Sequence, residues 1–89
     1  MSYQVKLTAS AIRDLDRVPA RVLPAILEFI YGPLAGNPQK LGKPLRADFE
    51  GQWSARRSDY RVLYQIDDDE RLVVVTRVAH RGQAYHRQR

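Results

Sequence analysis

Every second side chain is apolar in residues 3–7, which read YQVKL. This alternation is typical of a short strand that buries one face. Thr8 follows as a helix N-cap, and Ile12 and Leu15 then lie on one side of the helix that it would begin. Pro19 bounds this segment, so the chain should open with a strand and a short helix.

A second helix is predicted over residues 20–31, where apolar side chains recur at spacings that give a wide helical face. Those side chains are Val22, Leu23, Ile26, Leu27, Phe29 and Ile30. An interior proline removes one helix hydrogen bond and crowds the previous turn, so the helix should kink or begin near Pro24. Gly32 and Pro33 should end it.

Periodicity is lost over residues 36–51, where glycines and prolines interrupt the pattern and Lys43 and Arg46 add positive charge. We expect one long loop here. Loops of this length in compact domains are usually functional or mobile.

The remaining chain is predicted to form three strands, at residues 52–57, 60–66 and 72–81. If Ser58 and Asp59 form a two-residue turn, Arg56 faces Arg61, and paired side chains share a face of the sheet. One face then carries Trp53, Ala55, Val62, Tyr64 and Ile66 as a core for the helices. The other face carries Gln52, Ser54, Arg56, Arg61 and Leu63.

The register of the third strand depends on the length of the acidic turn before it. An odd turn places Arg81 on the Arg61 face, with Val73 and Val75 between them, whereas an even turn places His80 there and directs Arg81 toward the helices. Because burying an unpaired arginine is costly, we expect the odd turn.

Size and composition limit what this chain can do. Eighty-nine residues form a single domain, 1–89, with one modest core and no room for an enclosed cofactor cavity. No cysteine is present, and His80 and His86 have no nearby acid at metal-ligand spacing, so we expect neither a metal nor another cofactor. Without a long apolar run or a signal peptide, the protein is expected to be cytoplasmic and not to associate with membranes.

Positive charge is concentrated toward the C-terminus. Residues 71–89 hold five arginines and both histidines without one carboxylate. Such a distribution points to phosphate-rich or acidic partners. Arg56 and Arg61 would repel each other unless an anion lies between them. With Tyr85 and His86 near the same face, these groups suit a bent, partly single-stranded RNA.

Four blocks of the chain carry a family resemblance. They are EFIYGPL at 28–34, NPQKLGKPL at 37–45, WSARRSDYRVLYQID at 53–67 and HRGQAYHR at 80–87. In their order and spacing the chain resembles the RelE branch of the RelE/ParE superfamily, and actinobacterial RelE toxins in particular. These are the toxic halves of type II toxin–antitoxin pairs. The resemblance implies an α+β fold with a small antiparallel sheet of three to four strands, an N-terminal helical hairpin on one face and a basic concave face on the other.

The resemblance also implies an activity, which is metal-independent cleavage of mRNA in the ribosomal A site by attack of the ribose 2′-hydroxyl. By motif position, Arg61 would hold the scissile phosphate, Arg81 would support developing charge, and Tyr85 would stack on a base or orient the reacting groups. His80 or His86 would be the general acid or base. The further RNA-binding residues would be Arg56, Arg57, Lys43 and Arg46.

Partners follow from the same resemblance. They are the ribosome, mRNA and a cognate antitoxin, either RelB-like or Phd/YefM-like. Well-studied relatives have lysines at the positions of Gln52 and Ser54, so the activity could be altered. Two other functions stay open: a ParE-like protein that poisons DNA gyrase, and a degenerate toxin that acts only through its antitoxin.

Overall fold

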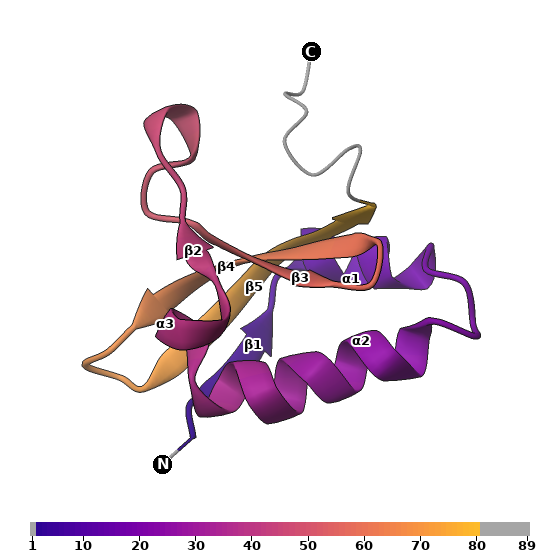
Figure 1. Cartoon of the computed structure of the whole chain (residues 1–89), viewed down its shortest axis with the longest axis horizontal. Helices are drawn as coiled ribbons and strands as arrows, with labels where there is room; N and C mark the ends of the chain where they lie inside the picture. Colours follow the sequence, from indigo (N-terminus) through magenta and orange to yellow (C-terminus); the bar gives the residue numbers. More distant parts are fainter. Residues whose placement is uncertain (1, 81–89) are drawn as a thin grey trace.

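A computed structural model of the chain describes residues 2–80. Its helices and strands run in the order β1 (Gln4–Leu7), α1 (Ala9–Asp16), α2 (Leu23–Phe29), the π-helix η1 (Ile30–Leu34), α3 (Pro38–Leu41), β2 (Lys43–Pro44), the 3-10 helix η2 (Ala47–Phe49), β3 (Trp53–Arg57), β4 (Tyr60–Asp67) and β5 (Leu72–His80). The strands form one sheet in the order β1-β5-β4-β3-β2 (Figure 1).

The predicted α+β fold is confirmed, with two differences in the sheet. Five strands are present instead of three to four, because β1 joins the edge and a two-residue β2 pairs with β3. The sheet is also mixed, since β1 runs parallel to β5 while the other pairs are antiparallel. A parallel pair needs a crossover, and the two helices lie in the long connection that follows β1.

The helices bury their apolar sides against one face of the sheet. Ala11 and Leu15 of α1, Ile26 of α2 and Ile30 of η1 pack with strand residues that include Tyr64. Thr8 begins α1 as predicted, because its Oγ1 accepts a hydrogen bond from the Ala11 N–H at 3.1 Å.

The start of the second helix agrees with the prediction, but its end does not. Pro24 lies in the first turn of α2, where a missing N–H costs no helix hydrogen bond. Pro33 was expected to end the segment, yet the chain continues through η1 to a cap at Ala35. Ile30 and Leu34 are both fully buried, so packing favours continuation over the stop signal.

Residues 36–51 are not one long loop as expected, because α3, β2 and η2 fall within them. A long-range contact fixes this segment: the Tyr64 hydroxyl donates to the Pro38 carbonyl oxygen at 2.7 Å. Gly42 lies directly beside Tyr64, where a Cβ would overlap the hydroxyl and come within 2.8 Å of the Ser54 carbonyl oxygen. The absence of a side chain at Gly42 therefore lets the segment close over the sheet.

The predicted register of the β3–β4 hairpin is confirmed, but the predicted register of the third strand is wrong. Arg56 pairs with Arg61 and Trp53 with Tyr64, as a two-residue turn requires. The following turn is even, however, since Asp67 pairs with Leu72. This places Val73 and Val75 in the core and not beside Arg61.

A β-bulge then changes the face on which the end of β5 lies. The register passes from Tyr64 opposite Val75 to Leu63 opposite Arg77, so Thr76 is an extra residue. As a result Ala79 lies opposite Arg61, and His80 lies opposite Tyr60. The even-turn expectation that His80 joins the Arg61 face is therefore also wrong.

None of the helices within residues 2–80 has the length and apolar character that a membrane crossing requires.

Candidate nucleic-acid interface

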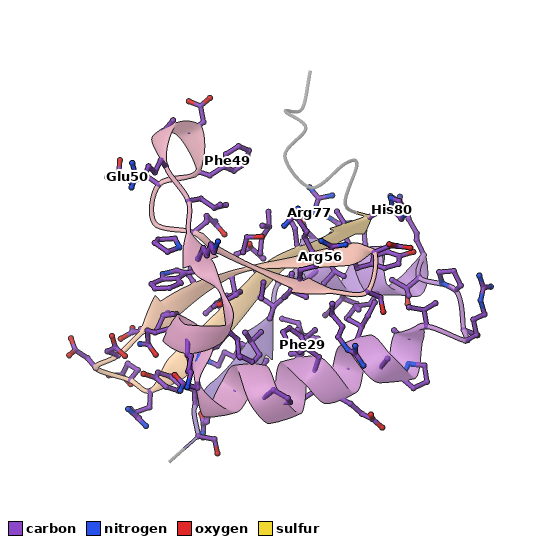
Figure 2. All side chains as sticks on the ribbon, in the orientation of Figure 1. Phe29, Phe49, Glu50, Arg56, Arg77 and His80 are labelled. Carbon is purple, nitrogen blue, oxygen red and sulfur yellow. The ribbon has the colours of Figure 1, made fainter. Side chains whose placement is uncertain are left out.

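The face of the sheet opposite α1 and α2 carries the candidate interface, and we call it the distal face. It is defined by Lys43, Ser54, Arg56, Arg61, Leu63, Gln65, Arg77 and Ala79, which share one side through the strand register. Arg56 and Arg61 lie directly opposite each other on it. Figure 2 shows Arg77 on the side of the sheet away from α2.

Two further cations come from the segment that precedes β3. Lys43 pairs with Ser54, so its side chain belongs to the distal face. Arg46 is exposed and immediately precedes η2, which rises from the sheet on the side away from α2 (Figure 1). The structure therefore brings Lys43, Arg56 and Arg61 to one face and places Arg46 on an arm beside it.

Arg77 is a distal-face cation that the sequence analysis missed. Its Nε donates to the Asp14 Oδ2 at 2.7 Å, and its Nη2 lies 3.3 Å from the Asp14 Oδ1. The hydrogen bond to Asp14 raises the pKa of Arg77 above its ordinary value, so the group stays charged. Asp14 also accepts the Val78 N–H at 2.9 Å, and α1 therefore covers the edge of β5 that β1 leaves unpaired.

Charge changes sign along the distal face. Arg56, Arg61 and Arg77 lie toward the end with the β3–β4 turn, whereas the β4–β5 turn carries Asp67 and Asp68. A hollow of about 530 Å³ at that acidic end is lined by Gln65, Asp67, Asp68, Asp69 and Gly51, among others. A polyanion would therefore be attracted to one end of the face and repelled from the other.

Gln52 and Ser54 stand where the family resemblance implies lysines, and both side chains are uncharged. The Thr76 Oγ1 lies 2.8 Å from the Gln52 Oε1 and 3.2 Å from the Leu63 carbonyl oxygen, so the bulge orients the Gln52 amide. Ser54 is buried, with 8% of its surface exposed. Neither residue supplies charge, and the cations of this face are mainly arginines.

The other predicted site residues lie elsewhere or outside the described residues. Arg57 pairs with Tyr60 and so belongs to the opposite face by register. It lines a groove with Glu28 and Phe29, and its neighbour Arg56 lines the same groove at the edge of the sheet. The His80 ring makes an edge contact with Tyr60, with centroids 5.6 Å apart. Three of the predicted residues fall outside residues 2–80: Arg81, Tyr85 and His86.

Within residues 2–80, no three histidine or carboxylate side chains come together in a way that could hold a metal ion. What the described part of the interface offers is electrostatic: guanidinium groups on adjacent strands can bind phosphate oxygens through paired hydrogen bonds.

The fold and the basic distal face together define a class of protein. Comparison with known proteins identifies that class. A sequence model of the family described as "ParE toxin of type II toxin-antitoxin system, parDE" matches residues 5–85. The chain belongs to this family, within the RelE/ParE superfamily, and is a toxin of the type II toxin–antitoxin class.

Two relatives from Mycobacterium tuberculosis are similar over almost the whole chain. Toxin RelE is 52% identical over 83 residues, which cover 93% of this chain and 86% of the relative. Toxin RelG is 48% identical over 87 residues, covering 98% of this chain and all of the relative. The predicted resemblance to actinobacterial RelE toxins is confirmed.

Solved structures agree with this assignment. The toxin–antitoxin complex RelBE2 from M. tuberculosis contains a chain that matches with a TM-score of 0.88 and 48% identity, covering 91% of this chain and 93% of that one. The archaeal RelE–RelB complex from Pyrococcus horikoshii matches with a TM-score of 0.67 and 25% identity, covering 94% of this chain and 100% of that one. The isolated Escherichia coli RelE toxin, at 17% identity and a TM-score of 0.71, shares the fold; the match covers 89% of this chain and 84% of that one.

Proposed function

We propose that this toxin is a ribosome-dependent endoribonuclease that inhibits translation by cutting mRNA without a metal ion. The observation that carries the proposal is the pairing of Arg56 with Arg61 on the face of the sheet opposite α1 and α2. Two cations opposed across a strand pair repel each other, and a phosphodiester bound between them would reduce that repulsion.

In this mechanism the ribose 2′-hydroxyl attacks the adjacent phosphorus, and the bond to the 5′-oxygen of the next nucleotide breaks. The products are a 2′,3′-cyclic phosphate and a 5′-hydroxyl, and the proton lost by the 2′-hydroxyl is balanced by one gained at the leaving oxygen. Arg61 would hold the phosphate and stabilise the extra negative charge of the transition state. An arginine is charged at every accessible pH, so its part is electrostatic and not proton transfer.

The remaining roles stay as the family resemblance suggests. Arg81 would support charge at the phosphate or leaving oxygen, and Tyr85 would stack on a base. His86 is the candidate for proton transfer. His80 is a weaker candidate, because its side chain lies opposite Tyr60 and away from the Arg61 face.

We also propose a cognate antitoxin with an acidic segment as the partner. The RelBE2 structure is a toxin–antitoxin complex, and the archaeal RelE is in complex with RelB. An acidic segment that covered the distal face would neutralise the toxin by blocking Arg61. If charge dominates, the complex should dissociate more readily at high salt, whereas insensitivity to salt would indicate apolar docking.

A second candidate function is inhibition of DNA gyrase without hydrolysis, because the matching family is described as ParE. The two candidates are separated by a supercoiling assay with purified protein. Inhibition of supercoiling with intact RNA would favour the gyrase reading.

Primer extension on mRNA bound to translating ribosomes tests the nuclease. The wild-type chain should produce new 5′ ends within the message. Arg61→Ala should reduce the cleavage rate by about 100-fold or more, which is the scale of losing one transition-state donor. Uncut message with the folded wild-type toxin would reject the proposal.

A further inference from the structure

We propose that the surface between α1 and the end of β5 is a second phosphate-binding site, which holds the RNA backbone beside the phosphate at Arg61. The identity of the ligand as RNA rests on the proposed function. Apart from His80, which the resemblance gives as a candidate acid or base, the site uses residues that neither the resemblance nor the nuclease mechanism involves. We call it the α1 groove and define it by Ser10, Arg13, Asp14, Arg17, Arg77 and His80.

The groove consists of two hollows on either side of the Asp14–Arg77 ion pair. One hollow, of about 290 Å³, is lined by Ser10, Arg13, Asp14, Arg17 and Arg77. The other, of about 170 Å³, shares Asp14, Arg17 and Arg77 and adds Tyr60 and His80. The shared residues make the two hollows neighbours along α1.

Positive charge exceeds negative charge in this groove. Among the described residues that line the two hollows, Asp14 is the one carboxylate, and it faces three arginines. The C-terminal end of a helix contributes only about half a negative charge, so the three guanidinium groups outweigh Asp14 and the helix dipole together. An anion that enters is therefore attracted.

Two of the three guanidinium groups, those of Arg77 and Arg13, are held by hydrogen bonds before an anion binds. The Nε and Nη2 of Arg77 both point to the Asp14 carboxylate, so the remaining donors of this planar group face away from it. Arg13 donates from its Nη2 to the Ser10 Oγ at 3.2 Å. Arg17 follows Arg13 by four residues, which places both on the same side of α1. Side chains fixed before binding lose less entropy when a ligand arrives.

The groove continues the line of cations on the distal face. Arg56 lies on β3, Arg61 on β4 and Arg77 on β5, and α1 follows beside β5, where the Thr8 N–H donates to the Val75 carbonyl oxygen at 3.0 Å. Figure 2 shows Arg56, Arg77 and His80 at the same end of the sheet. A strand bound at Arg61 can thus pass over Arg77 to Arg13 and Arg17.

The lining favours RNA over an acidic protein segment. An amphipathic helix needs apolar anchors in its groove. All five residues that line the larger hollow are polar or charged, so that hollow offers no such anchor. The smaller hollow has some apolar surface, from Val18, Val78 and Ala79. Phosphate groups, in contrast, match the paired donors of guanidinium groups directly.

The test is the binding of the purified full chain to a fluorescein-labelled 20-nucleotide 2′-O-methyl RNA, followed by anisotropy over a series of salt concentrations. This RNA has no free 2′-hydroxyl, so binding is measured without cleavage. The test variant is Arg13→Gln/Arg17→Gln. The matched control is Arg21→Gln/Lys40→Gln, which removes two charges from exposed positions that line neither hollow.

For the test variant we expect the affinity at 0.1 M salt to fall about tenfold or more, and the slope of log K against log salt to decrease by about 1.4. The control should change the affinity less than about threefold. Thermal melting checks that both variants fold. If the double variant does not fold, Arg13→Gln alone replaces it, and the expected change in slope is then about half as large.

Equal effects of the test and control variants would overturn the second site. So would unchanged RNA binding with weakened binding of a polyglutamate peptide, since the groove would then hold an acidic protein segment. These results are independent of catalysis. Loss of RNA binding at Arg13 and Arg17 in a toxin that cuts no message would support the groove and reject the nuclease, and normal cleavage with equal effects of both variants would reject the groove alone.

Discussion

Arg56 on β3 and Arg61 on β4 are direct partners in the antiparallel ladder, so both side chains leave the same face of the sheet from opposed positions. Like charges in this arrangement destabilise a sheet. An anion bound beside both guanidinium groups would reduce this repulsion.

Replacing Arg56 should separate stability from function. In Arg56→Gln the repulsion is gone, so the free energy of unfolding in urea should stay equal or rise by about 0.5 kcal/mol. Binding of RNA should weaken in the same variant. A loss of more than about 1 kcal/mol in stability would mean that Arg56 is a structural residue and would argue against this interpretation.

Asp14 should be the most sensitive carboxylate of α1. Asp14→Ala removes the partner of Arg77 and leaves the buried Val78 N–H without its acceptor, so we expect a loss of about 2 kcal/mol in the free energy of unfolding. Asp16→Ala is the control, since Asp16 is exposed at the last position of the same helix, and it should change stability by less than about 0.5 kcal/mol. Similar losses in both variants would show that Asp14 does not hold the edge of β5.

Gly42 should not accept a side chain. In Gly42→Ala the new methyl group would overlap the Tyr64 hydroxyl, so we expect a loss of about 1–3 kcal/mol by chemical denaturation. Gly36→Ala is the comparison, because nothing lies within 4 Å of a Cβ at that position. A stable Gly42→Ala variant would mean that residues 36–51 do not close against Tyr64.

Because of Tyr64, the free energy of unfolding should fall in strongly alkaline solution. Burial raises its pKa from 10.0 to about 12. Between these values the unfolded chain has lost the phenolic proton while the folded chain keeps it. Stability should therefore be unaffected by this group below pH 10 and fall as the pH rises toward 12, by at most about 1.4 kcal/mol per pH unit.

Tyr64→Phe isolates this effect. The variant loses the hydrogen bond to Pro38 and should be less stable by about 1 kcal/mol at neutral pH. Its stability should then decline less steeply than that of the wild type above pH 10. Tyr31→Phe, which changes an exposed ring, should keep the wild-type decline. Parallel curves for Tyr64→Phe and the wild type would contradict the assignment.

Local rules were enough to predict the hairpin and the two faces it presents. A two-residue turn at Ser58 and Asp59 fixes the register, so the opposition of Arg56 and Arg61 follows from the sequence alone. The N-cap at Thr8 and the helix start near Pro24 are equally local, and both are present.

Features that depend on distant contacts were missed. The bulge at Thr76 shifts the register of β5, and its hydroxyl contacts Gln52 and Leu63 on other strands. In the sequence, Arg77 interrupts the apolar pattern of a β-strand. Its partner Asp14 is 63 residues away, so local patterns do not predict the ion pair. In the same way, Tyr64 orders residues 36–51 through a contact that their own pattern of glycines and prolines does not reveal.

The central claim is that RNA lies on the face of the sheet opposite the helices. Arg56 and Arg57 are adjacent on β3 and both exposed, but only Arg56 shares its face with Arg61. The most direct test compares Arg56→Gln with Arg57→Gln in the cleavage of mRNA on translating ribosomes. We predict that Arg56→Gln lowers the rate about tenfold or more, the scale of one lost phosphate contact, and that Arg57→Gln changes it less than about threefold. Equal losses, or a larger loss for Arg57→Gln, would contradict the claim.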